Sequence, residues 1–395
     1  MSLLKQQSAH LRHWLHDQAL PLWLENGYLG KGSGFSEVLT LTGKPTSAHK
    51  RSRVHPRQIY CFSEASFRGL SLGAQNDVVL NVLSYFDRTY RLPTGFYGAL
   101  TNAEDVLIDD SFDLYNQAFA LLAFSYVAKA RPETATEMSF KASSLLKALK
   151  LHYAHPQAGF NEAIPSRLPL CSNPHMHLFE AALACEEREG FDARIWAELA
   201  DEIARLCMNH FIDAKSGGLR EFFDADWAPY PGEKGRIMEP GHQFEWAWLL
   251  ARWADRRHDQ RALSIAKRLF TIGETYGICA DRQVAVMALL DDFSVHDNGA
   301  RLWPQTEWLK GAVRLAVLSA GDERERYLQS ASRAAHALEF FLDVPLKGLW
   351  RDKLKPDGTF VEEAAPASSL YHILCAIYEF GDCIALLSEE EKQSI

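Results

Sequence analysis

The chain has 395 residues, of which 47% are hydrophobic and 24% are charged, a composition typical of soluble globular proteins. Its 51 acidic residues outnumber 42 basic ones, for a formal net charge of −9 without any basic run, so we expect neither nucleic acid nor an anionic membrane as a partner. No apolar run reaches about 18 residues, which argues against a membrane span, and seven scattered cysteines without a C-x-x-C motif favour reduced thiols in a cytoplasmic protein.

Residues 5–24 form the first predicted element. Their apolar side chains, among them Leu11, Trp14, Leu15 and Trp23, recur at helical spacing with charges interspersed. A continuous apolar core and a cleavage site are both missing from this stretch. We therefore predict an amphipathic helix and not a signal peptide.

One short signature then recurs along the chain: a glycine, a bulky apolar residue and a polar stretch rich in turn-forming residues. Its six copies start about 60 residues apart, at Gly34, Gly95, Gly159, Gly218, Gly277 and Gly348. The copy at Gly277 matches the others least well. The last copy contains Asp357-Gly358 between apolar residues, which is a hairpin turn signal. We therefore predict short β-hairpins at these positions.

Two helical segments are expected between successive hairpins. The more apolar helices are predicted at 55–72, 112–130, 174–189, 242–258, 304–320 and 367–381. The more charged, amphipathic helices are predicted at 76–91, 135–153, 192–212, 259–275 and 322–342, with 5–24 as the sixth. Six helix pairs with one buried and one exposed partner predict an all-α (α/α)6 barrel of twelve helices, in a single domain over 1–395. An open α-solenoid is the alternative.

The first turns of the more apolar helices carry polar side chains where a purely structural barrel would carry Leu and Val. These side chains are Arg57; Asp113, Tyr115, Asn116 and Gln117; Asn173, His175, His177 and Glu180; Glu239, His242 and Glu245; Trp303, Gln305, Glu307 and Lys310; and His372. If the inner helices face one axis, these groups meet at one end of the barrel. The pattern predicts a polar pocket there.

Histidines in such a pocket are suited to proton transfer near neutral pH. His175 and His177 lie on nearly opposite sides of a helix, so both would rarely reach one metal ion, and we expect no metal. Neither a Walker motif nor a dinucleotide fingerprint occurs, so we expect no cofactor. Glycoside hydrolysis by carboxylates among Glu239, Glu245 and Glu307 is an alternative. A non-catalytic interaction protein is another.

Several of these segments carry a family resemblance. The motifs are PRQIYCF around Arg57, DLYNQAFALLA from Asp113, NPHMHLFEA from Asn173, EPGHQFEWAWLL from Glu239 and SLYHILCA from Ser369. Over roughly residues 10–380 the chain resembles the N-acylglucosamine 2-epimerase family, which includes renin-binding protein, mannose isomerases and cellobiose 2-epimerases. The resemblance implies an (α/α)6 barrel, a free sugar as substrate and a possible homodimer.

The resemblance also implies roles for single residues. His242 and His372 match the two general acid/base histidines of the family, and Arg57 matches its sugar-binding arginine. The other positions matched to site residues are Tyr115, Asn173, His177, Glu245, Gln305 and Glu307, and we add Glu239 as a substrate-binding candidate from its place at a helix start. Gln305 and Glu307 lie in WPQTEW, which departs from the WWPHSEA of the epimerases.

The chemistry follows from the acidity of a proton next to a sugar carbonyl. After ring opening, a base removes the proton from C2, and its return to C1 gives a ketose while its return to C2 gives an epimer. We assign the carbon-bound proton to His372 and the oxygens to His242, with Arg57 stabilising the developing charge. The motifs favour isomerisation of free mannose to fructose. The alternative is 2-epimerisation of N-acylglucosamine or cellobiose; a phosphorylated sugar would need more cations than Arg57, Arg53 and Lys310.

Overall fold

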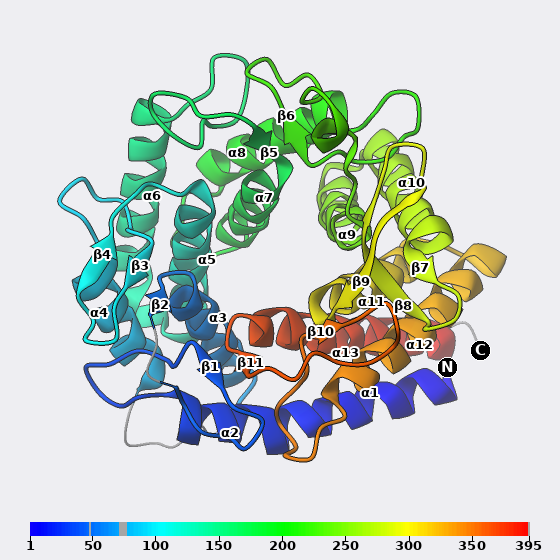
Figure 1. Ribbon diagram of the computed structural model, residues 1–395, viewed down its shortest axis with the longest axis horizontal. Coiled ribbons are helices and arrows are strands. Elements are labelled where there is room, and N and C mark those ends of the chain that lie inside the picture. The colour runs from blue at the N-terminus through cyan, green and yellow to red at the C-terminus, as the bar shows by residue number, and fades with distance from the viewer. Residues whose placement is uncertain (47–48, 71–76, 394–395) are drawn as a thin grey trace.

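The computed structural model describes residues 1–46, 49–70 and 77–393. Within these ranges, six helices form an inner ring in which each helix contacts the next and the last contacts the first (Figure 1). They are α3 (Val54–Phe67), α5 (Leu114–Ala130), α7 (Ser172–Glu186), α9 (Pro240–Arg257), α11 (Leu302–Val317) and α13 (Ser369–Gln393). The ring is closed, so the described chain is a barrel and not an open solenoid.

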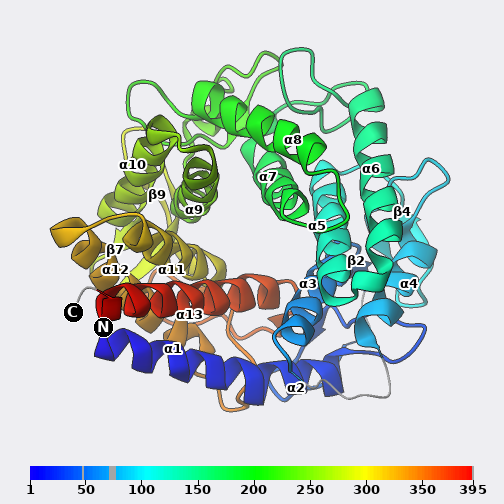
Figure 2. The same cartoon turned by 180° about the vertical axis from the view of Figure 1, so that it is seen from behind.

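Six outer helices each pack against an inner partner (Figure 2). They are α1 (Ser2–Trp14), α4 (Val78–Tyr90), α6 (Ala135–His152), α8 (Ala193–Leu206), α10 (Gln260–Gly277) and α12 (Gly321–Leu342). α1 packs against α13, and its path continues through π-helical turns at Leu15–Ala19 and Trp23–Gly27, with α2 (Leu20–Leu22) between them. The two ends of the chain therefore close the ring, as the predicted pairing of 5–24 with the last helix requires.

The difference between the layers follows from the sequence. Nearly every side chain of α5 is buried, whereas α8 buries one stripe, including Trp196 and Ile203, and exposes charges on the other side. A helix that is apolar all round needs neighbours on every side, and an amphipathic one needs a neighbour on one side only. The predicted helices agree with the observed ones to within a few residues at most ends. Residues 71–72 and 76, placed in predicted helices, lie outside the described residues.

α13 is the one described helix that is long and apolar enough to cross a membrane by length and composition. Its most apolar window is 78% buried inside the protein, as in the core helix of a soluble protein, so the evidence for a span is weak. Short 3-10 helices occur at Pro132–Thr134 and Glu233–Arg236, and a π-helical turn follows α8 at Cys207–Phe211. All seven cysteines are unpaired.

Short antiparallel strands gather at one end of the ring, the face turned toward the viewer in Figure 1. They are β1 (Val38–Leu39), β2 (Lys50–Arg51), β3 (Leu100–Thr101), β4 (Leu107–Asp109), β5 (Leu170–Cys171), β6 (Phe222–Phe223), β7 (Ile278–Cys279), β8 (Val284–Leu289), β9 (Val295–Arg301), β10 (Lys353–Leu354) and β11 (Ala365–Pro366). They pair as β1-β11, β2-β3-β4, β5-β6 and β7-β8-β9-β10. Most pairs join neighbouring repeats, which ties the helix pairs together at this end.

The recurring glycine signature is the start of each hairpin. The apolar residues Phe35, Phe160 and Leu219, each directly after the glycine, form antiparallel bridges to the end of the preceding helix. The copy at Gly277 differs, because there α10 ends and β7 begins, and the six-residue β8 and seven-residue β9 follow. The sequence did not predict this long hairpin, since its turn contains no glycine and uses Phe293 at a φ of 65°.

Candidate active site

A cavity of about 310 Å³ opens at the end of the barrel where the inner helices begin. This volume is at the lower end of the range for small-molecule sites. Eight of the ten residues predicted for substrate binding or catalysis line it: Arg57, Tyr115, Asn173, His177, Glu239, His242, Glu245 and His372. The remaining lining residues are Arg51, Arg53, Met287, Arg301, Trp303, Ser368 and Ser369.

The inner helices reach this cavity through a repeated two-residue register. In α9, Gln243 accepts from the backbone N–H of Leu219 and donates to its C=O, which fixes the hairpin, while Glu245 lines the cavity. In α7, His175 accepts from the N–H of Phe160, and His177 lines the cavity. Two residues along a helix turn the side chain by about 200°, so one position serves the hairpin and the other serves the site.

The same register explains where Gln305 lies. Its amide accepts from the N–H of Ala285 at 2.8 Å and donates to the carbonyls of Ala285 and Arg301. Gln305 is fully buried and does not line the cavity, so the expectation that it contacts a sugar does not fit its position. Glu307, two residues later, lies behind the cavity wall instead of on it, and it acts on His372.

His242 lies between two carboxylates. Its Nδ1 is 2.9 Å from Oε2 of Glu221 and 3.6 Å from Oε2 of Glu239. Burial disfavours the charged ring, but Glu221 and Glu239 outweigh burial and raise the pKa of His242 to about 10. Burial raises the pKa of Glu239 to about 7 against the opposing charge of His242. At neutral pH His242 is therefore an imidazolium whose other ring nitrogen is available as a donor.

His372 has the opposite environment. Its Nδ1 is 2.9 Å from Oε1 of Glu307, whose Oε2 lies 2.5 Å from the fully buried ammonium of Lys310. Burial and the charges of Arg57 and Lys310 lower the pKa of His372 well below its ordinary value. The Glu307 carboxylate is paired with the Lys310 ammonium and lies next to Nδ1 of His372. A carboxylate can only accept, so we assign Nδ1 of His372 as the donor of this hydrogen bond. Nε2 of this neutral ring is then the basic nitrogen.

Trp303 links the two histidines. Its ring centroid is 5.0 Å from that of His242 and 6.0 Å from that of His372, with both imidazoles tilted against it. All three residues line the same cavity. The imidazoles, 130 positions apart in the chain, are thus both in contact with one indole. An aromatic face between two proton-transfer groups suits the apolar face of a sugar ring or chain.

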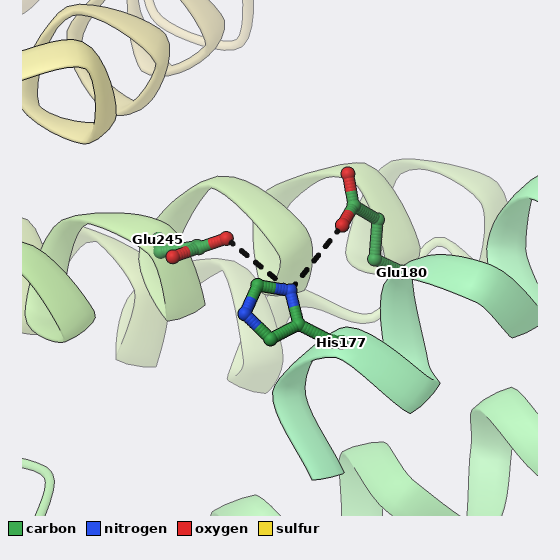
Figure 3. A group of neighbouring side chains, drawn as sticks. All are labelled: His177, Glu180 and Glu245. Carbon is green, nitrogen blue, oxygen red and sulfur yellow. Dashed lines mark ion pairs between the residues drawn. The ribbon is translucent and has the colours of Figure 1, made fainter. Parts of the chain in front are cut away.

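The third helix of the inner ring contributes His177 (Figure 3). Its Nδ1 faces two carboxylates, Glu180 at 3.6 Å from the same helix and Glu245 at 3.9 Å from α9. Burial lowers the pKa of His177 to about 4, and burial together with Glu307 raises the pKa of Glu245 well above its usual range. Neither Nδ1 of His177 nor either oxygen of Glu245 has a hydrogen-bond partner within the described part of the chain. Buried polar atoms rarely remain unpaired, so these atoms are suited to ligand hydroxyls.

Arg57 lies at the start of α3, which packs between α5 and α13 in the inner ring. It is 5% exposed, donates to the hydroxyl of Tyr115 and to the carbonyl of Ser368, and lies 4.3 Å above the ring of Phe119. Among the described residues, Nε of Arg57 and Oδ1 of Asn173 have no hydrogen-bond partner. Both residues line the cavity and thus present a cationic donor and a neutral acceptor to a ligand.

Sequence reasoning missed Glu221, which orders His242, and the rim residues Arg51 and Arg301. A signal for Glu221 was present in the repeat signature, where a glutamate stands three residues after the glycine in three copies, at Glu37, Glu162 and Glu221. In each case the glutamate accepts a hydrogen bond next to an inner-helix start: from Arg51, from the N–H of Cys171, and from His242. Met287 comes from β8 of the unpredicted hairpin.

Three groups of His and carboxylate side chains have ligand atoms within 4.8 Å of one another: His177, Glu180 and Glu245; Glu221, Glu239 and His242; and Glu245, Glu307 and His372. Hydrogen bonds and ion pairs among their own members account for much of this closeness, since His242 and His372 each lie 2.9 Å from a carboxylate oxygen. Their oxygen and nitrogen donors also suit a divalent cation. The expectation of a metal-free site stays a prediction.

Comparisons with known proteins place the chain in a family. The chain is 62% identical over 378 residues to "Mannose-6-phosphate isomerase" of Rhizobium meliloti (strain 1021), covering 96% of this chain and 97% of that protein. It is 26% identical to "D-mannose isomerase" of Thermobifida fusca over 66% of this chain and 67% of that protein. A crystal structure of D-mannose isomerase superposes with a TM-score of 0.84 at 18% identity, covering 96% and 97% of the two chains, which supports the predicted fold. The sequence profile of the N-acylglucosamine 2-epimerase (GlcNAc 2-epimerase) family matches residues 34–376, and the chain therefore belongs to this family.

Proposed function

We propose that the protein is a sugar isomerase that interconverts a mannose-type aldose and the corresponding ketose by moving a proton between C2 and C1. The observation that carries this proposal is the pair of histidines that contact Trp303 in one cavity. Carboxylates raise the pKa of His242, whereas burial and two cations lower the pKa of His372. The name of the relative that matches nearly the whole chain points to the same reaction class. The family match leaves 2-epimerisation as the alternative outcome.

In the proposed reaction His372 is the base. Its neutral Nε2 takes the proton from C2 of the open-chain aldose, and the imidazolium that forms returns the proton to C1. Glu307 accepts from Nδ1 at 2.9 Å, so it holds the ring orientation and stabilises the transient positive charge. Lys310 keeps Glu307 in place from the far side at 2.5 Å.

His242 acts on the oxygens. As an imidazolium it donates to the C1 carbonyl oxygen while negative charge develops there, and it exchanges protons between O1 and O2 in the enediol. Glu221 accepts from its Nδ1, which leaves Nε2 to face the sugar. The Arg57 guanidinium adds a second fixed positive charge for the same intermediate. The unpaired atoms of Asn173, His177 and Glu245 are then available to the remaining hydroxyls.

The test uses His242→Asn and His372→Asn with His10→Asn, an exposed histidine of the outer helix α1, as the matched control. Each protein is incubated with mannose in D₂O, and products and deuterium at C1 and C2 are followed by chromatography and NMR. We expect His372→Asn to abolish exchange at C2 and both site variants to abolish ketose formation, while the control behaves as wild type. Full exchange in both site variants would end the proposal, and glucose without fructose would assign 2-epimerisation instead.

A further inference from the structure

Four arginines line the cavity, whereas the proposed reaction uses only one of them, Arg57. They occur at two depths. Arg57 is deep and 5% exposed, whereas the side chains of Arg51, Arg53 and Arg301 are 43%, 27% and 38% exposed and form the rim. Lys310, which the sequence offered as another cation, is fully buried in its pair with Glu307 and does not reach the cavity.

Each rim arginine is held in place by one carboxylate. Glu37 accepts from Arg51, Asp113 accepts from Nη2 of Arg53 at 3.1 Å, and Asp352 accepts from Nε and Nη2 of Arg301 at 2.9 and 2.7 Å. Asp352 itself is buried at 1% exposure.

A guanidinium carries five N–H donors in a fixed plane, and one carboxylate can accept from only some of them, so the others stay free to bind a ligand. Nε of Arg53, for example, is buried without a partner. The carboxylates therefore orient the arginines and leave part of each guanidinium to the cavity.

The helices add to the positive potential at this end. All six inner helices begin around the cavity, and residues at or beside the first turn of each line it. Arg53 and Arg301 are the residues directly before α3 and α11. A helix N-terminus presents unpaired N–H groups and a partial positive charge, which favours anions. Guanidinium forks match the oxygens of a phosphate in pairs.

We propose that Arg51, Arg53 and Arg301 bind the phosphate of a hexose 6-phosphate at the rim of the cavity, with C1 and C2 of the same sugar between His242 and His372. This inference rests on the proposed function and names its substrate class. The open-chain sugar places its phosphate at the carbon farthest from the reacting pair, which matches a rim of cations above a deep pair of histidines. Arg57, the deep arginine, remains with the reacting oxygens.

The experiment compares mannose 6-phosphate with mannose in Arg53→Gln, Arg301→Gln and Arg53→Lys. For each glutamine variant we expect KM for mannose 6-phosphate to rise about 10- to 100-fold, as for loss of a charge-assisted hydrogen bond. We expect KM for mannose to change much less than KM for mannose 6-phosphate, and Arg53→Lys to recover part of the loss. Arg236→Gln is the matched control, because Arg236 pairs with Asp291 and Asp292 outside the cavity.

Inorganic phosphate serves as a second probe. We expect it to compete with mannose 6-phosphate in the wild type and to do so less strongly in Arg53→Gln. A wild type that converts mannose but not its 6-phosphate overturns the inference and leaves the proposed function standing, even if free phosphate inhibits. Equal losses on both substrates overturn it as well, whereas no turnover of either sugar by the wild type would defeat the proposed function itself.

Discussion

Replacing Glu221 with glutamine tests how the charge of His242 is set. The Glu221 carboxylate is 3% exposed and lies 2.9 Å from Nδ1 of His242, so glutamine keeps a hydrogen-bond acceptor and removes the negative charge. An opposite charge this close shifts a pKa by about 1 to 3 units. Glu239 remains at 3.6 Å, so the pKa of His242, about 10 in the wild type, is expected to fall to between about 7 and 9.

The assay is the pH dependence of kcat/KM for the sugar substrate. Because the reaction requires the imidazolium of His242, activity falls at alkaline pH as that ring loses its proton, and Glu221→Gln is expected to move this fall to lower pH by about 1 to 3 units. At pH 7 the variant is expected to keep at least about half of its activity, because His242 is half protonated when the pH equals its pKa. Glu64→Gln, an equally buried glutamate paired with Arg68 and Lys129, is the matched control.

The same pair predicts a pH-dependent difference in stability. A raised folded-state pKa stabilises the protein fully below the unfolded value of 6.5, and this contribution is lost as pH rises through about 10. At about 1.4 kcal/mol per pKa unit, a shift of about 1 to 3 units gives Glu221→Gln a deficit of about 1.4 to 4 kcal/mol near pH 6 that closes toward pH 10. An alkaline limb that stays in place, or a stability deficit that grows with pH, would refute this reasoning.

Three further predictions concern residues around the site. Gln305→Ala is expected to lower the free energy of unfolding by about 1 to 3 kcal/mol, because the Ala285 backbone loses both partners, while KM stays unchanged; a large rise in KM in a stable variant would contradict this. Gly159→Ala places a Cβ 2.7 Å from Leu206 at a φ of +74°, so urea titration should show a loss of at least about 1 kcal/mol, and an unchanged midpoint would count against it. Lys310→Met removes a cation that lowers the pKa of His372, so the acid limb of kcat/KM should move to higher pH; a shift to lower pH is the contrary result.

The barrel was predictable because two sequence patterns, one long-range and one local, both reveal its repeat. The glycine signature sets the spacing of about 60 residues, and helical periodicity between copies separates buried from exposed helices. Six polar helix starts then indicated a site, and the family motifs identified His242 and His372. These inferences needed only local patterns, since each inner helix brings its first turn to the same end of the ring.

Other parts of the site depend on register and on long-range contact. The sequence assigned the polar side chains to the first turns of the inner helices without fixing which of them face the cavity. In the structure, the glutamine or histidine that binds the hairpin sets the register, so Gln305 lies off the cavity and Glu307 is the equivalent of Glu245. Glu221 precedes His242 by 21 residues, and its contact arises only when the hairpin folds over the start of α9. Arg301 reaches the rim at the end of β9, in a hairpin without a glycine turn signal.

The two catalytic candidates show why residue type alone does not assign a role. His242 has two carboxylates beside it, and neither forms an ion pair with a Lys or Arg among the residues that the structure describes, so its imidazolium balances their charge. His372 also has a carboxylate at 2.9 Å, but Lys310 already neutralises that group and Arg57 adds a further positive charge, so a proton on His372 would be in excess. The two rings can therefore hold opposite states at one pH, which an isomerase needs if one group is to remove a proton from carbon while the other donates to oxygen. Any substitution that alters the balance of carboxylates and cations around either ring should change activity through pH before it changes the fold.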